Sequence, residues 1–178
     1  DAVAIVGAEC GGHPGMDLIG SFVNATMALE QLDIPFLIGG GVGHGAQIIA
    51  AMTMGAAGVV MGTRFLVAQE IWAHTGYKQA LIAATETDTT LCMQGIRNTL
   101  RALKNKTTDK VQQIEREQAR VDIQDLYPYI SGEIGRRAYQ TGDTTTGMLS
   151  AGQALAFVKK IEPLADIVAS LEREANQA

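Results

Sequence analysis

The sequence predicts an α/β fold in which short parallel strands alternate with crossover helices, followed by a helical extension. Three observations support this prediction. The first 84 residues contain short, continuously apolar runs, and glycine closes each run. Such runs are typical of parallel strands that are buried on both faces. Segments with helical spacing separate the runs, and the alternation stops after residue 84. Open doubly wound sheets and closed barrels share this pattern, so the alternation alone does not choose between them.

The elements of the first part follow one another closely. The predicted elements are, in order, strand 2–6, helix 21–31, strand 36–38, helix 46–54, strand 58–61 and a longer helix from Phe65 to about Ala84. A glycine-rich loop links the first strand to the first helix. The second strand stops at Gly39-Gly40-Gly41, and Gly55 is placed to cap the C-terminus of the second helix.

The second part has a different character. The predicted elements are a polar connection over 85–90, a solvated turn over 104–109, and helices over 110–120, 134–140, 150–157 and 163–174. Ser150 and Gln153 have the spacing of a helix capping box. We therefore expect residues 1–84 to hold the strand–helix units and residues 85–178 to form a helical extension packed on them, rather than an independent domain.

Composition limits the possible function classes. The chain has 178 residues, of which 47% are hydrophobic, and a formal net charge of −5. No long basic run is present, so neither a nucleic acid nor a membrane is expected as a partner. Cys10 and Cys92 form no CxxC pair, which favours a reducing, cytoplasmic location. Because the chain begins at Asp1, directly ahead of an apolar run, we expect a preceding segment to have been cut, removed or lost.

Two neighbouring loops predict a phosphate site. Gly39-Gly40-Gly41 and Gly62-Thr63 each follow a buried strand and precede a helix. Such loops expose backbone N–H groups and the positive end of a helix dipole, which favours an anion. Glycine lets the backbone approach phosphate oxygens, and the Thr63 hydroxyl adds a donor. The alternative is that these glycines only end the strands. Arg64 either helps to hold the anion or pairs with Glu70.

His13 is the candidate catalytic residue. It follows the first strand and therefore lies at the same edge as the phosphate loops. An unperturbed imidazole, with a pKa near ~6.5, transfers protons near neutral pH. The alternative is a loop histidine that only bonds the backbone. Because Glu9 is expected to raise the pKa of Cys10, that cysteine is interpreted as a small buried residue. His13, His44 and His74 lack the spacing of a zinc site, so no metal is expected.

These motifs, in this order, resemble the nitronate monooxygenase (2-nitropropane dioxygenase-like) family. That family includes NADH:quinone reductases and FMN-dependent enoyl-acyl-carrier-protein reductases. The matching segments are Glu9-Cys10-Gly11-Gly12-His13-Pro14-Gly15, Ile34-Pro35-Phe36-Leu37-Ile38-Gly39-Gly40-Gly41-Val42 and Gly55-Ala56-Ala57-Gly58-Val59-Val60-Met61-Gly62-Thr63-Arg64-Phe65-Leu66. The resemblance covers roughly residues 1–105, and Ser150-Ala151-Gly152-Gln153 matches in the tail.

The resemblance implies a (β/α)₈ TIM barrel, of which this chain holds the C-terminal part with about three strands. FMN is then expected at the C-terminal mouth of the barrel. The implied cofactor-binding residues are Gly12, Gly40, Gly41, Gly62, Thr63 and Gln153. In the same family pattern His13 is the acid/base beside the flavin, while the cofactor carries the redox chemistry.

The function implied by the resemblance is FMN-dependent oxidation of alkyl nitronates with O₂. Quinone or enoyl-acyl-carrier-protein reduction, with NADH as a second small-molecule partner, is the alternative. Members of the family carry five further strands ahead of the first one here, and a whole barrel needs about 250 residues. We therefore expect the N-terminal half of the barrel, or a homo-oligomeric partner, to complete the site. A non-catalytic half-barrel that persists only with another chain is the alternative of a different class.

Overall fold

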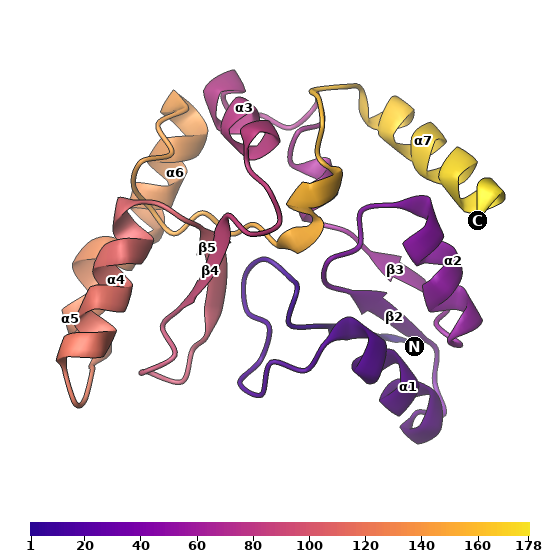
Figure 1. The fold of residues 1–178 in the computed structure, drawn as a ribbon, viewed down its shortest axis with the longest axis horizontal. Coiled ribbons are helices and arrows are strands. Elements are labelled where there is room, and N and C mark those ends of the chain that lie inside the picture. The colour runs from indigo at the N-terminus through magenta and orange to yellow at the C-terminus, as the bar shows by residue number, and fades with distance from the viewer.

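The computed structural model describes residues 1–178, and its first sheet has three parallel strands (Figure 1). They are β1 (Val3–Val6), β2 (Phe36–Gly39) and β3 (Gly58–Val60), in the spatial order β1-β2-β3. The register pairs Ile5 with Ile38 and Ile38 with Val59. Because all three strands run the same way, the loops that follow them meet at one edge of the sheet.

Two helices, both predicted from the sequence, cover one face of this sheet. They are α1 (Ser21–Gln31) and α2 (Gly45–Thr53). Phe36 and Ile38 are buried in the same cluster as Ala25 of α1 and Ala51 of α2. Side chains alternate across a strand, so the intervening Leu37 points to the opposite face, where it is only half-buried. Ala4, Val6 and Val60 on that opposite face are exposed, so the expectation that the strands are buried on both faces is wrong for this chain. The predicted C-terminal cap of α2 is confirmed, since Gly55 follows the helix with φ 90°.

The predicted long helix over 65–84 is wrong. The chain forms a short 3₁₀ helix, η1 (Thr63–Phe65), and then runs irregularly until α3 (Thr75–Ala83). Tertiary partners take the backbone groups that a helix would use. The buried Lys78 ammonium donates to the carbonyl of Ala68 at 2.6 Å, and the N–H of Gln69 donates to the carbonyl of Glu162 at 2.9 Å. His74 then caps α3 by accepting from the N–H of Gly76.

The part after residue 84 contains an antiparallel hairpin that the sequence analysis does not predict. Its strands are β4 (Thr89–Cys92) and β5 (Leu100–Leu103), so the predicted polar connection over 85–90 is wrong at its end. The hairpin lacks the Asn-Gly or Asp-Gly turn that makes short hairpins recognisable. Its turn instead contains Met93 and Arg97 at φ 63° and 57°, a conformation that neither residue type signals.

The helices of this part are α4 (Lys106–Glu117), α5 (Ile123–Ile130), α6 (Gly132–Thr141) and α7 (Leu164–Gln177). Three of them match predicted helices, whereas α5 was not predicted. α4 begins before its predicted start because the Asn105 side chain caps it, accepting from the N–H groups of Thr107 and Thr108. None of the helices combines the length and the apolar character that a bilayer crossing requires.

The helix predicted over 150–157 is a shorter 3₁₀ helix, η2 (Gln153–Phe157), and the predicted capping box is absent. The residue before η2 is Gly152, and no side chain caps the helix. Ser150 does not reach the helix because its backbone pairs with Ala102 of β5. The N–H of Gly152 instead donates to the Thr63 side chain.

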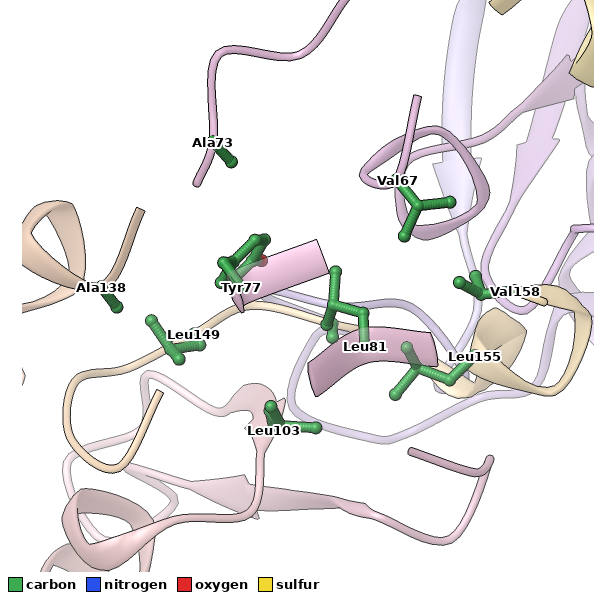
Figure 2. Close-up of a cluster of buried hydrophobic side chains, with 10 residues drawn as sticks. Val67, Ala73, Tyr77, Leu81, Leu103, Ala138, Leu149, Leu155 and Val158 are labelled. Carbon is green, nitrogen blue, oxygen red and sulfur yellow. The ribbon is translucent and has the colours of Figure 1, made fainter. Parts of the chain in front are cut away.

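The largest hydrophobic cluster joins segments from both parts of the chain (Figure 2). Its members are Val67, Ala73, Tyr77, Leu81, Leu103, Ala138, Leu149, Ala151, Leu155 and Val158. α3, β5, α6 and η2 therefore pack on one another, with α3 at the junction. The proposed boundary after residue 84 stays a prediction.

Candidate functional site

A cavity of about 280 Å³ lies at the carboxyl ends of the three parallel strands. The loops after β1, β2 and β3 line it, together with the segment ahead of η2. Its lining residues include Cys10, Gly40, Gly41, Gly62, Thr63 and Ser150. The structure therefore brings together Gly40, Gly41, Gly62 and Thr63 of the two loops that predict a phosphate site, whereas Gly39 does not line the cavity.

Unused hydrogen-bond donors surround this cavity. The backbone N–H groups of Gly40, Gly41 and Gly62 donate to no acceptor within the chain. Gly40 and Gly41 adopt φ of 97° and 70°, a conformation that L-residues rarely adopt, so glycine is needed there. A Cβ atom added to Gly62 would meet nothing within 4 Å. The Thr63 oxygen accepts from the N–H of Gly152 at 2.9 Å, which leaves the hydroxyl hydrogen free to donate. This donor set fits a phosphate.

The N-terminus of α1 holds a carboxylate from its own chain. The Glu9 carboxylate accepts from the backbone N–H of Ser21 at 3.1 Å and from its hydroxyl at 2.9 Å. The same hydroxyl oxygen lies 2.9 Å from the carbonyls of Gly39 and Gly40. A negative charge is favourable at the start of a helix, and Glu9 supplies it. This contact connects the first loop to the second, and the Glu9 carboxylate takes the place at the start of α1 that another anion would occupy.

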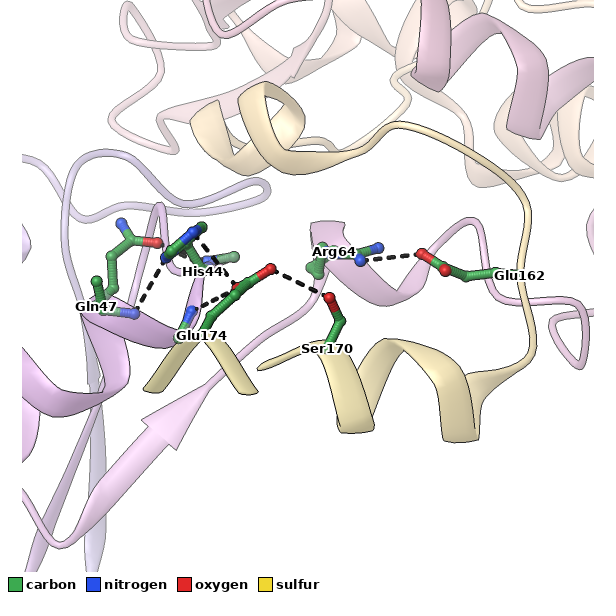
Figure 3. Close-up of polar contacts among 9 residues, drawn as sticks. His44, Gln47, Arg64, Glu162, Ser170 and Glu174 are labelled. Atoms are coloured by element: carbon green, nitrogen blue, oxygen red, sulfur yellow. Dashed lines mark hydrogen bonds and ion pairs between the residues drawn. The ribbon is translucent and has the colours of Figure 1, made fainter. Parts of the chain in front are cut away.

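The N-terminus of α2 is also satisfied by side chains (Figure 3). Gly45 donates its N–H to Glu174 of α7 at 2.8 Å, and Ala46 donates to Nδ1 of His44 at 3.1 Å. Gln47 accepts from the N–H of Gly43 at 2.8 Å and donates to the carbonyl of Gly41 at 3.0 Å. The unused donors of the second and third loops therefore make the cavity between these loops the candidate anion site.

Arg64 takes neither of the roles expected for it. Its guanidinium forms a buried ion pair with Glu162 at 3.1 Å, and the Glu70 carboxylate instead caps the N–H of Leu164. Lys160 approaches the other oxygen of Glu162 at 2.9 Å. Burial raises the pKa of the Glu162 carboxyl, but the hydrogen bonds and charges of Lys160 and Arg64 outweigh burial, so this pKa lies below its usual value.

The structure places the remaining expected residues around the cavity rather than in it. His13 is exposed, in the loop after β1, and is not among the cavity residues. Gly12, at φ 82°, exchanges two backbone hydrogen bonds with Arg101 of β5, one in each direction. Gln153 begins η2, donates its N–H to the carbonyl of Glu9 at 2.9 Å, and lines a neighbouring apolar cavity of about 430 Å³.

Cys10 lines the cavity but is poorly suited to act as a nucleophile. Burial raises the pKa of its thiol, the nearby Arg101 opposes this shift, and Glu9 adds to it. Only the thiolate is strongly nucleophilic, so a raised pKa disfavours that role near neutral pH. The geometry agrees with the interpretation of Cys10 as a small buried residue.

Two features of the site escaped the sequence analysis. Glu9 caps a helix that begins twelve residues later, and Arg101 reaches the first loop across 93 positions. Neither contact has a local sequence signature. The only available signal was Glu9 itself, a charged residue directly after a buried strand.

Comparison with known proteins adds a family and two structural matches. A family model described as nitronate monooxygenase matches residues 1–174. The nitronate monooxygenase of Paraburkholderia phytofirmans is 31% identical over 190 residues, a match that covers 100% of this chain and 50% of that protein. A probable nitronate monooxygenase of Staphylococcus saprophyticus is 28% identical over 186 residues, covering 99% of this chain and 51% of that protein.

Among solved structures, FabK from Thermotoga maritima matches with a TM-score of 0.90 and 29% identity, over 99% of this chain and 55% of that one. Nitroalkane oxidase from Streptomyces ansochromogenes matches with a TM-score of 0.80 and 28% identity, over 100% and 52%. These matches confirm the predicted fold class, a C-terminal part of a TIM barrel with an extension. The chain spans about half the length of the curated relatives it matches.

Proposed function

Since this chain belongs to the nitronate monooxygenase family, we propose that it carries the phosphate site and the acid/base of an FMN-dependent oxidoreductase that oxidises alkyl nitronates with O₂. The observation that carries the proposal is the set of unused donors around one cavity. The residues that line it, at the carboxyl edge of a parallel sheet, include three whose backbone N–H groups have no acceptor in the chain and one with a hydroxyl, Thr63. A single terminal phosphate fits this arrangement, and no GxGxxG dinucleotide fingerprint follows any strand.

In this proposal the residues divide between binding and proton transfer. Gly40, Gly41, Gly62 and Thr63 bind the phosphate of FMN, and Gln153 and Gly12 lie along the rest of the cofactor. When bound, FMN supplies the electron transfer and the reaction with oxygen. His13 accepts the α-proton of a neutral nitroalkane, whereas a nitronate has already lost that proton. His13 stays exposed in this chain, so a substrate and the rest of the barrel have access to it.

The remaining barrel strands are part of the proposal. β1 and β3 each have one unpaired edge in the three-stranded sheet, and Val6 and Val60 are 37% and 39% exposed. Unpaired strand edges favour pairing with further strands. We therefore assign the N-terminal half of the barrel, or a second protein chain, to these edges. A half-barrel without catalysis is the alternative, and it requires no flavin at all.

The identity of the cofactor provides the first test. Protein that contains both halves of the barrel is purified, its cofactor is released by heat, and the released compound is identified by mass. FMN is the expected result. FAD would contradict the assignment of FMN, and no flavin after reconstitution would contradict the proposal and favour the half-barrel without catalysis.

The reaction provides the second test, because the Gly12-His13 motif fits NADH-driven reductases of the family equally well. The flavin-loaded protein is mixed with an alkyl nitronate in air and, separately, with NADH without oxygen. Nitronate turnover with little change in flavin absorbance on NADH addition supports the monooxygenase. Rapid bleaching by NADH with no nitronate turnover would overturn this choice and support quinone or enoyl-acyl-carrier-protein reduction.

A further inference from the structure

Arg101 of β5 binds both ends of the turn that precedes His13. Its backbone N–H donates to the carbonyl of Gly12 at 2.7 Å, and its own carbonyl accepts from the N–H of Gly12 at 3.0 Å. Its side chain reaches the other end of the turn, where Nε and Nη2 donate to the carbonyl of Ala8 at 3.1 and 3.0 Å. One residue of the hairpin thus holds residues 8 and 12, and His13 follows directly.

The guanidinium of Arg101 is directed at neutral partners. Its third nitrogen, Nη1, donates to the hydroxyl of Thr89 on the adjacent strand at 3.1 Å. No carboxylate forms an ion pair with it, although the side chain is half-buried. The fork of donors instead fixes a carbonyl of the loop.

The rest of the same loop is fixed independently of Arg101. The Glu9 carboxylate binds Ser21, and the Glu9 carbonyl accepts from the N–H of Gln153 at 2.9 Å. Gly11 lies so close to the backbone of Ala151 and Gly152 that an added Cβ would approach them to 2.7 Å. The phosphate loops make no hydrogen bond to Arg101. Loss of the Arg101 side chain is therefore expected to free the Ala8 end of the turn, while the backbone pair between residue 101 and Gly12 remains, so that the loop that carries His13 is held at one end only.

We propose that Arg101 is a positioning residue, which holds the Gly12-His13 turn so that the imidazole faces the substrate. This inference rests on the proposed role of His13 as the acid/base. It assigns the β4–β5 hairpin, which lies beside the loop after β1 in Figure 1, a part in the reaction. A planar guanidinium holds the Ala8 carbonyl with two donors, whereas a lysine offers a single flexible ammonium.

The test uses the flavin-loaded full-length protein and five variants. Arg101→Met removes the fork, Arg101→Lys keeps the charge, and Arg97→Met makes the same chemical change at an exposed position of the same hairpin. The variant His13→Asn and the double variant His13→Asn/Arg101→Met complete a double-mutant cycle with Arg101→Met and the wild type. Turnover is measured with a neutral nitroalkane and with its pre-ionised nitronate. Hydrogen exchange of residues 8–15 is measured in parallel.

Arg101→Met is expected to keep FMN and to slow the neutral nitroalkane by up to ~10²-fold, because small misplacements of a catalytic group have effects of this size. Nitronate turnover should change far less. Arg101→Lys should recover part of the loss, and Arg97→Met should match the wild type. In the His13→Asn background the added Arg101→Met change should have almost no effect, since residues that act as a unit are not additive.

Equal slowing of both substrates, or independent and additive effects of the two substitutions, would overturn the inference while leaving the proposed function intact. A wild-type protein that turns over neither substrate would contradict the proposed function instead. In that case hydrogen exchange alone tests whether Arg101 positions the loop. Faster exchange of residues 8–15 in Arg101→Met, with unchanged exchange at residues 36–43 and in Arg97→Met, supports the positioning role. Unchanged exchange of residues 8–15 contradicts it.

Discussion

The Oγ1 atom of Thr63 accepts a hydrogen bond from the backbone N–H of Gly152 at 2.9 Å. This contact joins the end of β3 to the segment ahead of η2 and forms one wall of the cavity. Gly152 also lies against the Glu9–Gly11 loop, where an added Cβ would come within 2.6 Å of the Glu9 carbonyl and the N–H of Gly11. The buried Thr63 hydroxyl is therefore one of the contacts that join the extension to the strand–helix part of the chain.

We predict that Thr63→Val weakens both the fold and FMN binding. Valine has the shape of threonine but leaves the buried N–H of Gly152 without an acceptor, which costs ~1–3 kcal/mol. The phosphate also loses one donor, so the Kd for FMN should rise by about tenfold, equivalent to ~1.4 kcal/mol. Thermal unfolding and flavin titration measure the two effects. Thr63→Ser keeps the hydroxyl and should stay close to the wild type, and equal behaviour of both variants would contradict the assigned role.

Gly62→Asp is predicted to abolish retention of FMN without unfolding the protein. A Cβ at this position enters open space in the cavity, so the fold tolerates the side chain while its carboxylate repels the phosphate. Gly132→Asp is the matched control, because a Cβ there also meets nothing within 4 Å but lies at the start of α6. Flavin absorbance and circular dichroism are measured after purification. Bound flavin in Gly62→Asp would place the phosphate elsewhere.

Gly41 offers a less specific version of this experiment. Its φ is 70°, and an added Cβ would lie 3.0 Å from the Cβ of Glu9. A side chain at this position therefore strains the backbone and pushes on the loop that caps α1. Loss of flavin in Gly41→Asp would report distortion as well as charge, so Gly62 is the better position.

The strands and the phosphate loops were predictable because their signals are local. Phe36-Leu37-Ile38 is continuously apolar, and the glycines that follow it mark the end of a strand whatever lies beyond. The resemblance added the barrel and the order of its loops. The helix over 65–84 failed for the opposite reason. Its apolar residues, such as Val67, pack into the hydrophobic core although the backbone there is irregular. Hydrogen bonds to Lys78 and Glu162 hold this backbone in place.

Contacts across the chain account for the rest of the site. The β4–β5 hairpin was not predicted because its turn residues, Met93 and Arg97, do not usually adopt positive φ. Without the hairpin, the contact between Arg101 and Gly12 has no basis in the sequence. The pairing of Arg64 with Glu162 across 98 positions is similar, since the sequence left open only an anion or the nearer Glu70 as partners of Arg64.

Glu162→Gln is predicted to destabilise the protein most at neutral pH. The folded-state pKa of Glu162 lies below its usual value of 4.5, so its charge contributes stability above that value. This contribution is lost as the pH falls through the lower, folded-state pKa. Removing one charge of a buried pair leaves the charge of Arg64 uncompensated, and the free energy of unfolding is expected to fall by up to ~3 kcal/mol. Chemical denaturation from pH 7 to pH 3 measures it.

The difference in free energy of unfolding between wild type and Glu162→Gln should be widest at pH 7 and should narrow below pH 4.5. Glu172→Gln on α7, an exposed position, is the control and should show almost no difference. If the free energy of unfolding of Glu162→Gln differed from that of the wild type by the same amount from pH 7 to pH 3, the ion pair would not contribute to stability.

His13→Asn is predicted to separate proton removal from the later steps of the reaction. If the imidazole removes the α-proton of a carbon acid, turnover of a neutral nitroalkane should fall by ~10²–10⁴-fold, the usual contribution of a positioned base. The pre-ionised nitronate has no such proton, so its turnover should fall far less. FMN should remain bound, because His13 lies outside the cavity that Gly41 and Thr63 line. Steady-state rates with both substrate forms provide the measurement, and Asp17→Asn, at an exposed position of the same loop, is the control. A uniform loss with both substrate forms would assign His13 to binding or orientation rather than to proton transfer, and unchanged rates would remove it from the reaction.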